Sequence, residues 1–332
     1  MERLRVCGRW LWGNLHREYE SYWWLAPVLI GWLGLLAAVV GLSAHELTLG
    51  WQPAIVLAAF AHQLMWGAVV ALALLLAARR WWAVFLALVI FSGVAATQAG
   101  SYVSGGKPGS GASLTLLQAN LRVGAADPAH LVQEVRDDHV DIATTEELTT
   151  SEQARLTSAG LAAALPYRYL APLPDGGGGL GIWSRYPLTA KVNHPGFELG
   201  VLSVQVASPA GAITLFAVHL LPPYPYPAGE WLHEIAALKT LLDHAGGHVV
   251  VAGDFNATMD NAQFRGLLAD GYGDAAAELG AGYLPTYPTD RWFPPLIAID
   301  HVLTENVQPA HLSTVGLTGS DHRGLLARLV VS

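Results

Sequence analysis

The chain has 332 residues, of which 52% are hydrophobic and only 13% are charged, and its mean hydropathy is +0.36. This composition excludes an ordinary soluble protein of the same length. The single cysteine, Cys7, excludes an intrachain disulfide, and the formal net charge of −8 argues against a general attraction to polyanions.

Three uncharged runs lie in the first 100 residues, at about 23–44, 52–78 and 81–100. Each run reaches the roughly 20 residues that an α-helix needs to cross the hydrocarbon core of a bilayer. Nine of the twelve tryptophans precede residue 83, several of them at the ends of these runs, where an aromatic belt is expected. Residues 1–100 are therefore predicted to be a membrane anchor of three transmembrane helices.

Basic residues predict the orientation of this anchor. Arginines at positions 3, 5, 9 and 17 precede the first run, and Arg79 and Arg80 separate the second from the third. The segment between the first two runs has no Lys or Arg. The positive-inside rule then predicts a multi-pass cell-membrane protein with a cytoplasmic N-terminus and an extracytoplasmic domain after residue 100. A cleaved signal peptide is the weaker alternative, because the leader and the run are both long.

A Gly- and Ser-rich stretch follows the third run, and residues 101–113 are predicted to be a flexible linker. A tether of this length spans on the order of 20–25 Å as a random coil. The following domain is therefore expected to stay close to the lipid surface.

From residue 114 onward, apolar runs typical of strands alternate with amphipathic segments typical of helices. We expect strands at 114–121, 140–145, 180–184, 201–206, 213–219, 248–252, 297–304 and 325–331, and helices at 129–139, 151–164 and 230–244. Many strands with few helices indicate an α/β fold, a two-sheet sandwich in a single domain over 114–332.

Three short polar clusters stand against apolar runs near the C-terminus. They are Gly-Asp-Phe-Asn at 253–256, Ile-Asp-His at 299–301 and Ser-Asp-His at 320–322. Carboxylates that hold a divalent metal, a base that orients water and donors for phosphoryl oxygens are what a magnesium-assisted phosphate hydrolase needs. Taken alone, Asp254 and Asn256 are also consistent with residues that cap a turn after a strand.

Seven segments in order carry a resemblance to a known family. Besides the three clusters, they are Gln-Ala-Asn-Leu-Arg at 118–122, Asp-Ile-Ala-Thr-Thr-Glu-Glu at 141–147, Gly-Ile-Trp-Ser-Arg-Tyr-Pro at 181–187 and His-Leu at 219–220. This order resembles the endonuclease/exonuclease/phosphatase superfamily, which is DNase I-like. The match covers roughly residues 114–332, and it implies a metal-dependent phosphoric ester or pyrophosphate hydrolase.

The resemblance implies a metal site at the end of a strand. Glu147 stands where the family has its main magnesium-binding carboxylate, with Asn120 beside it as an oxygen donor and Asp321 as a further acidic ligand. Hard oxygen ligands suit Mg²⁺, and Mn²⁺ accepts the same set. The family usually has Gln before the metal-binding Glu, whereas this chain has Glu146; counting from Asp141 favours Glu147 over Glu146 as the ligand.

The resemblance also implies catalytic roles. Asp254 would orient or deprotonate the attacking water, with Asn256 fixing its position and contacting substrate. His322 paired with Asp300 would be a carboxylate-oriented imidazole, and this pairing fixes the tautomer and favours the charged form. His219 would donate to the transition-state oxyanion or to the leaving group.

Substrate is expected to be a phosphorylated molecule, with Arg185 as a phosphate contact. Proline- and aromatic-rich loops at 220–227 and 291–296 either form a stiffened lid or touch the lipid headgroup region. The layout resembles the teicoplanin-resistance type of membrane protein, which implies a lipid-linked phosphate such as undecaprenyl pyrophosphate, or a phospholipid headgroup, with membrane lipids as partners.

Two alternatives remain open on the sequence. One is a membrane-tethered extracytoplasmic nuclease using the same residues, and the other is a non-catalytic binding or sensing module. Residues 101–332 contain 12 basic and 22 acidic side chains, which lowers the expectation of a nucleic-acid substrate without excluding it. The second alternative would predict loss of part of the ligand set, which is complete here. The sequence does not indicate an oligomeric state.

Overall fold

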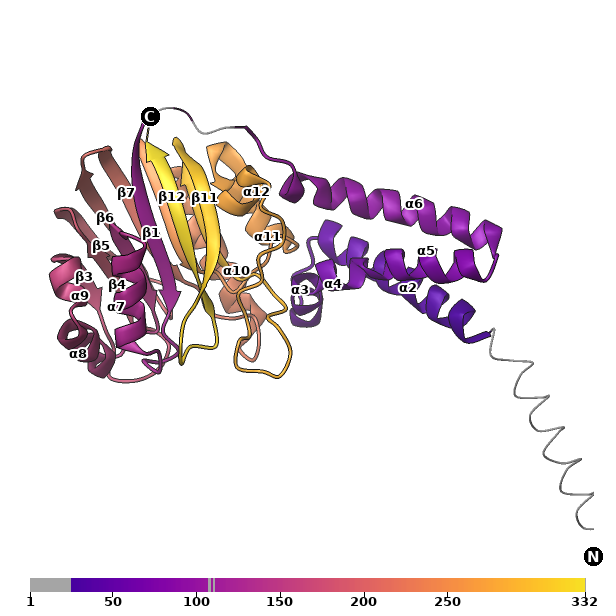
Figure 1. The fold of residues 1–332 in the computed structure, drawn as a ribbon, viewed down its shortest axis with the longest axis horizontal. Helices are drawn as coiled ribbons and strands as arrows, with labels where there is room; N and C mark the ends of the chain where they lie inside the picture. Colours follow the sequence, from indigo (N-terminus) through magenta and orange to yellow (C-terminus); the bar gives the residue numbers. More distant parts are fainter. Residues whose placement is uncertain (1–24, 107–108, 110, 332) are drawn as a thin grey trace, which may run out of the picture. The chain divides into compact units, whose positions relative to one another are not determined.

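The computed structural model describes residues 25–106, 109 and 111–331, which divide into two compact units (Figure 1). In the described part of the chain, the first unit contains residues 25–43 and Ala61–Thr97, and the second contains Ala44–Phe60 and residues 98–331. The arginines at 3, 5, 9 and 17, Cys7 and the start of the first predicted span lie outside the described residues.

The first unit is helical and packs through small residues. It holds most of α2 (Leu25–Glu46), α4 (Ala61–Met65), α5 (Gly67–Ala77) and almost all of α6 (Trp81–Gln98). The backbones of α2 and α5 approach so closely that a Cβ on Gly67 would lie 2.3 Å from the carbonyl oxygen of Gly34. Large apolar side chains such as Leu33 and Phe85 are exposed. Small residues inside and large apolar residues outside are typical of helices packed in lipid.

Two helices of this region are long and apolar enough to cross a membrane, Leu25–Glu46 and Trp81–Tyr102. Two further helices, Gln52–Ala59 (α3) and Ala61–Ala77, pass the same test only as a pair, bent by 63° at their break. The helix predicted over 52–78 is therefore broken, and it counts as a third span only if this bent pair is one span. The chain breaks at Phe60 because α3 belongs to the second unit, where Ile55 is buried in the hydrophobic core.

Residues 44–60 are bonded into the second unit by polar groups as well. The His45 Nδ1 atom lies 2.7 Å from Asp260 Oδ1, and Asn261 Nδ2 donates to the carbonyl oxygen of Ile55 at 3.0 Å. The sequence-based division at residue 100 thus differs from the structural one, because an apolar segment was expected to belong to the anchor by composition alone.

The segment after α6 is also held against the second unit. Residues Ala99–Tyr102 form a 3₁₀ helix (η1), and the Ser101 carbonyl accepts from Gly282 N at 2.8 Å. Gly105 N donates to the Glu278 carbonyl at 2.8 Å. The linker predicted over 101–113 is therefore bonded to the domain at these described residues and is not a free tether.

The second unit contains two six-stranded sheets, which confirms the predicted two-sheet α/β sandwich (Figure 1). The first sheet has the order β11-β12-β1-β2-β4-β3, and the second has the order β5-β6-β7-β8-β10-β9. The first sheet comprises β11 (Val307–Gly316), β12 (Arg323–Val331), β1 (Ala112–Asn120), β2 (Ile142–Glu146), β4 (Leu180–Ser184) and β3 (Tyr167–Ala171). The second comprises β5 (Leu188–His194), β6 (Val201–Ser208), β7 (Gly211–His219), β8 (His248–Asp254), β10 (Asp300–Glu305) and β9 (Gly273–Asp274).

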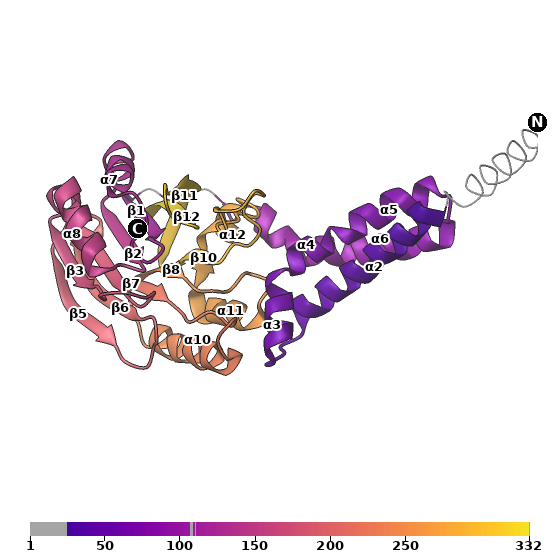
Figure 2. The same ribbon diagram turned by 90° about the horizontal axis from the view of Figure 1, so that it is seen from below.

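Helices cover the outer faces of both sheets (Figure 2). The first sheet is covered by α7 (Pro128–Asp137), α8 (Thr150–Ala159) and α9 (Leu161–Ala164), and the second by α10 (Ala228–Asp243) and α11 (Ala262–Arg265). The remaining elements are η2 (Gly266–Gly271) and α12 (Ala275–Leu279). The single helix expected at 151–164 is two helices, because Gly160 adopts a left-handed conformation (φ 104°) and ends α8.

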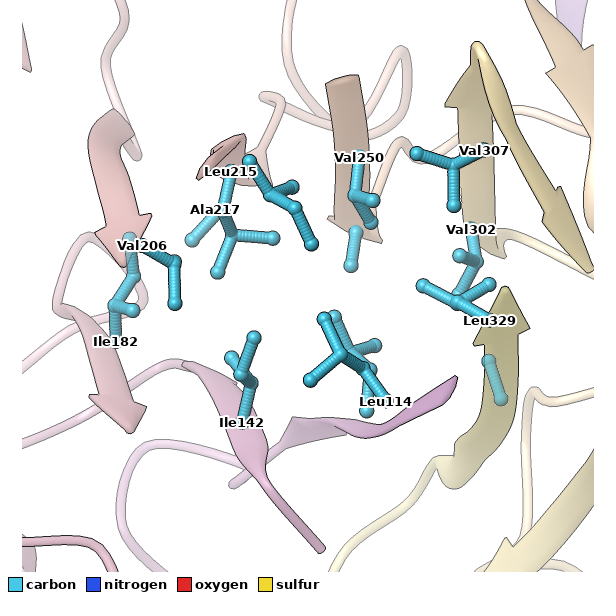
Figure 3. Close-up of a cluster of buried hydrophobic side chains, with 14 of the residues drawn as sticks. Leu114, Ile142, Ile182, Val206, Leu215, Ala217, Val250, Val302, Val307 and Leu329 are labelled. Atoms are coloured by element: carbon cyan, nitrogen blue, oxygen red, sulfur yellow. The ribbon is translucent and has the colours of Figure 1, made fainter. Parts of the chain in front are cut away.

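The core between the sheets follows the two-residue period of the strands (Figure 3). In β1, Leu114 and Leu116 point between the sheets, while Leu117 and Ala119 face the helices outside. In β8, Val250 points between the sheets and the next residue points outward. Continuing this alternation to the end of each strand predicts which polar side chains enter the space between the sheets.

Candidate active site

The site forms where the inward faces of the central strands reach one edge of the sandwich. Parallel β1 and β2 end together, with Asn120 opposite Glu146, and parallel β7 and β8 end together, with His219 opposite Asp254. Antiparallel β10 begins at Asp300, opposite Asp254. The carboxyl ends of parallel strands at one edge are where ligands bind in open α/β sheets.

Gly253 allows β8 to approach β7 at this edge. A Cβ on Gly253 would lie 1.8 Å from the carbonyl oxygen of Val218, and its backbone has φ 157°. Any side chain here would push the strands apart and displace Asp254, which explains why Gly precedes Asp in the Gly-Asp-Phe-Asn segment.

Asp300 and His322 form a buried ion pair. His322 Nδ1 lies 2.8 Å from Asp300 Oδ2, and Gln118 Nε2 donates to the other oxygen, Asp300 Oδ1, at 2.7 Å. Burial alone would lower the pKa of His322, but the Asp300 carboxylate outweighs it and raises that pKa to about 10. Burial likewise opposes ionisation of Asp300, and His322 overcomes it and lowers the Asp300 pKa. The imidazole is therefore charged at neutral pH, with Nε2 as its free donor.

Asp254 lies beside this charged imidazole. Its Oδ1 accepts from the backbone N of Asn256 at 2.8 Å, and His322 Nε2 lies 3.8 Å from its Oδ2. Burial and the neighbouring Asp300 carboxylate raise the pKa of Asp254. A carboxylate that is held rigidly and binds a proton more readily than usual suits a general base.

The hydrogen bonding of His219 places its Nε2 as an acceptor in this structure, whereas the sequence predicted a donor. Its Nδ1 lies 3.0 Å from the Gly177 carbonyl oxygen, so Nδ1 carries the proton and Nε2 is left as an acceptor. Burial and the charge on His322 lower the pKa of His219 to about 4. Because Nε2, 3.6 Å from Asp254 Oδ2, is unprotonated at neutral pH, the donor in this site is His322.

The structure separates the two adjacent glutamates. Glu146 ends β2 and is fully buried, with Gln118 Nε2 donating to its Oε2 at 2.9 Å. Burial, followed by the Asp300 charge, raises its pKa well above the ordinary value, which disfavours its charged form. Glu147 turns out of the strand with φ 57° and lines a pocket. Of the two glutamates, Glu147 is the one that lines the pocket.

Strained backbone accompanies the functional side chains. Left-handed φ values occur at Val123 (49°), Glu147 (57°) and Asn256 (49°). Val and Glu normally avoid this conformation, whereas Asn tolerates it. Val123 N donates to Glu147 Oε2 at 2.7 Å, so the strain at these two residues builds a contact to a site carboxylate. Such strain concentrates at functional sites.

The donor set fits a divalent cation. Glu147, Asp254 and Asp321 line the pocket at this edge, Asp300 lies opposite Asp254, and burial raises the pKa of Glu147. Atoms of Asp254, Asp300 and His322 lie within 4.8 Å of one another and could hold a metal ion. This edge of the sandwich is therefore a candidate site for a divalent cation.

Asn120, the predicted oxygen donor to the metal, is hydrogen-bonded through both polar atoms of its side chain. Its Oδ1 accepts from the backbone N of Arg122 at 2.9 Å, while its Nδ2 donates to Glu147 Oε1 and to Asp254 Oδ2, each at 3.2 Å. The two carboxylates orient the amide nitrogen of Asn120 toward themselves. In this arrangement Asn120 positions the two carboxylates rather than offering its oxygen.

These residues open into a pocket with a volume of about 490 Å³. Its polar side includes Glu147, His219, Asp254, Asn256, Asp321 and His322. Its other side includes the proline-rich segment Pro222–Tyr226 and residues of α3. A pocket of this size lies within the ~300–1,000 Å³ range of small-molecule sites.

One predicted site residue lies elsewhere. Arg185 follows β4, which is antiparallel to β2 and ends beside Ile142, at the opposite end of β2 from Glu146. Its Nε is 3.0 Å from Asp141 Oδ1, and its Nη2 donates to the Val140 carbonyl at 2.9 Å. The prediction of a phosphate contact is therefore wrong, and Arg185 instead joins β4 to the start of β2.

Two site residues were not predicted. Gln118 links Glu146 to Asp300, and a signal for it existed, since it lies two residues before Asn120 and so shares the inward face of β1. Tyr287 lines the pocket with its ring 4.8 Å from the His322 ring, and no local pattern marks it.

His301 faces away from the site. Its Nδ1 is 2.8 Å from Asp274 Oδ2, and its Nε2 is 3.0 Å from the Ala257 carbonyl oxygen. Phe264 packs against its ring with centroids 4.2 Å apart. Both ring nitrogens of His301 therefore have hydrogen-bond partners outside the site, and they hold β10 to its surroundings.

Fold and site together define the class of protein: a two-sheet α/β sandwich with a carboxylate–imidazole centre that suits a divalent cation. A model of the Endonuclease/Exonuclease/phosphatase family matches residues 117–322, and the chain belongs to this family. Its members are metal-dependent phosphoesterases and nucleases, so the chain is a hydrolase of this general kind.

Solved structures of the same fold come from animals and bacteria. A complex of Danio rerio TDP2 with a single-strand DNA product is 18% identical, has a TM-score of 0.57, and the match covers 66% of this chain and 99% of that one. An endonuclease/exonuclease/phosphatase from Beutenbergia cavernae is 18% identical with a TM-score of 0.53, over 66% of this chain and 72% of that one. A family protein from Bacteroides thetaiotaomicron is 15% identical with a TM-score of 0.52, over 68% and 100%. No curated protein sequence matched the chain.

Proposed function

We propose that this protein is a membrane-anchored phosphohydrolase that cleaves a phosphoester or pyrophosphate bond in a lipid-linked substrate. The observation that carries the proposal is the joint lining of one pocket by the carboxylate–imidazole centre and by an aromatic, proline-rich loop. Of that loop, Tyr224 is 68% and Tyr226 is 49% exposed, and in the neighbouring loop Trp292 is 95% exposed. Exposed aromatic side chains on loops favour a membrane surface over water.

The side chains divide the chemistry. Asp254, held by the Asn256 backbone, aligns and deprotonates the attacking water, and His322, kept charged by Asp300, donates from Nε2 to a phosphoryl oxygen. His219 Nε2 accepts a hydrogen bond and helps to orient the water or Asp254. A bound divalent cation, Mg²⁺ or Mn²⁺, held by Glu147 and Asp321, supplies Lewis-acid polarisation of the phosphoryl group.

The test compares substrates with the full chain in detergent and with Mg²⁺ present. Undecaprenyl pyrophosphate, a glycerophospholipid, single- and double-stranded DNA and a soluble aryl phosphodiester are incubated with wild type, Asp254→Ala and Asp274→Ala. Asp274 is an equally buried carboxylate outside the pocket, so it controls for general damage to the fold. Release of phosphate from a lipid, abolished by chelation and by Asp254→Ala only, supports the proposal.

Cleavage of DNA with no action on either lipid would replace this proposal with the tethered nuclease. Absence of turnover on every substrate, with metal still bound, would instead favour the binding or sensing module. Undecaprenyl pyrophosphate as the particular substrate, and the likeness to teicoplanin-resistance membrane proteins, remain predictions from the sequence.

We also propose that the catalytic unit lies outside the cytoplasmic membrane, as Arg79 and Arg80 between apolar segments indicate. The exposed Trp292 gives a site for testing this in intact cells. In a Cys7→Ser background, Trp292→Cys is expected to react with a membrane-impermeant maleimide. Labelling only after the cells are opened would place the unit in the cytoplasm.

A further inference from the structure

One face of α3 forms a wall of the active-site pocket. Val56, Ala59 and Phe60 all line the pocket, and their spacing of i, i+3 and i+4 puts them on a single stripe of the helix. Leu57, on the same helix, is exposed and does not line the pocket. A segment whose composition suggests a plain membrane anchor therefore contributes side chains to the site of chemistry.

This wall is fixed in place by bonds at the beginning of α3. Gln52 belongs to the same stripe, and its Nε2 donates to the carbonyl oxygens of Pro223 at 2.8 Å and Tyr226 at 2.6 Å. Ile55, one turn on, is buried in the core that underlies β7 and β8. The helix and the proline-rich loop are thus joined to each other and to the strands that carry His219 and Asp254.

The chemistry of the pocket changes from one side to the other. Val56, Phe60, Leu199, Ile297 and Ile299 supply aliphatic or aromatic carbon, whereas the catalytic residues supply carboxylates and imidazoles. Among the described residues that line the pocket there is no Lys or Arg. A nucleic-acid strand would bring further phosphates, which basic side chains normally bind. The lining instead suits a phosphate with one apolar substituent.

We propose that the α3 wall is a subsite for the hydrocarbon chain of the substrate, and that Val56 and Phe60 contact the part of that chain next to the reacting phosphate group. This inference rests on the proposed function, whose lipid-linked substrate makes prenyl pyrophosphates the compounds to test. At about 490 Å³ the pocket accommodates the pyrophosphate and the first part of the chain. The rest of a long chain extends beyond the pocket.

The experiment measures kcat/KM for a series of increasing chain length with the full protein in detergent. The substrates are dimethylallyl, geranyl and farnesyl pyrophosphate, with a soluble aryl phosphodiester as a chainless reference. Val56→Thr replaces a methyl by a hydroxyl at constant volume, Phe60→Ala shortens the wall, and Ala59→Leu narrows the pocket. Leu57→Ala is the matched control, because it removes an exposed side chain of the same helix.

For wild type, kcat/KM is expected to rise along the series. Val56→Thr and Phe60→Ala should each lower it for farnesyl pyrophosphate by roughly tenfold, as loss of apolar contact in a pocket does. The aryl phosphodiester should change by less than about twofold, and Leu57→Ala should leave every substrate unchanged. Ala59→Leu should reduce the gain from geranyl to farnesyl, and unchanged melting of Val56→Thr would show that the fold is intact.

Equal loss on prenyl and aryl substrates would overturn the subsite while leaving the proposed function in place, since the wall would then only support the catalytic residues. A flat chain-length series in wild type would overturn the subsite too. Hydrolysis of the aryl ester or DNA, with no prenyl pyrophosphate or lipid cleaved, would overturn the proposed function itself.

Discussion

Replacement of Asp300 by Asn separates the charge of the Asp300–His322 pair from its geometry. The Asn side chain keeps an oxygen that accepts from His322 Nδ1, at the 2.8 Å contact of the wild type, and keeps the shape that Gln118 packs against. The substitution removes the negative charge and also replaces the oxygen that accepts from Gln118 Nε2 by an amide nitrogen, so the Gln118 amide has to turn to keep a hydrogen bond there. Burial lowers the pKa of His322, and the Asp300 carboxylate, which mainly opposes this effect, is then absent. The imidazole is therefore expected to be largely neutral at pH 7.

The size of the effect follows from the pKa of His322. A rise of the pKa from the ordinary 6.5 of histidine to about 10 corresponds to roughly 5 kcal/mol of preference for the charged form. Breaking a buried pair by removing one charge costs about 3–5 kcal/mol by comparison with other proteins. Loss of a charged donor to the phosphoryl oxygen is expected to lower kcat by about 10²–10⁴.

The pH dependence has a definite sign. A histidine whose pKa is raised by folding contributes stability that is fully present below pH 6.5 and is lost progressively as the pH rises to about 10. The gap in melting temperature between wild type and Asp300→Asn should therefore be widest near pH 6 and should narrow toward pH 10.

The assays are metal-dependent hydrolysis of the soluble ester as a function of pH, NMR titration of the His322 ring and melting at several pH values. Asp274→Asn is the matched control, because Asp274 forms an ion pair of the same 2.8 Å length with His301 on the other face of β10. The control should lose stability without losing kcat. A His322 ring that stays charged above pH 9 in Asp300→Asn would refute the reasoning.

Three further changes test other parts of the structure. Glu146→Gln replaces a buried acid that does not line the pocket by its isostere, so activity should stay within about twofold; a loss above tenfold would mean that Glu146 acts as an anion. Arg185→Ala should cost about 1 kcal/mol of stability, because it removes the ion pair with Asp141, and KM should be unchanged on every substrate. A raised KM would mean that Arg185 contacts substrate. Gly34→Leu should disrupt the first unit, because a Cβ at this position would lie only 2.6 Å from the Gly67 carbonyl oxygen. A melting temperature in detergent equal to that of wild type would contradict this contact.

The sequence predicted the central strands and the polar residues at their ends because both depend on a local pattern. Buried strands give continuous apolar runs, and a two-residue period places Asn120, Asp254 and Asp300 on the inward face without knowledge of the fold. The strands that were not predicted are β3, β5, β9 and β11, which are the four edges of the two sheets. An edge strand such as β5, largely exposed and carrying Lys191, has no apolar run to detect.

Features that depend on distant segments could not be predicted. The wrong placement of Arg185 came from the direction of β4, which is set by its antiparallel pairing with β2. The hydrogen bond that sets the tautomer of His219 comes from the Gly177 carbonyl, 42 positions away. Neither fact leaves a trace in the local sequence.

The position of α3 makes part of the predicted anchor a part of the active-site pocket. By composition, residues 52–78 are one apolar run, but the structure assigns the first eight of them to the catalytic unit as α3 (Gln52–Ala59), where Ile55 is buried. Burying one isoleucine stabilises by about 1.5–3 kcal/mol, and Gln52 and Asn261 add hydrogen bonds at the same interface. A chain cut at residue 98 would therefore lose one wall of its pocket along with its anchor, and its substrate preference would not be that of the intact protein.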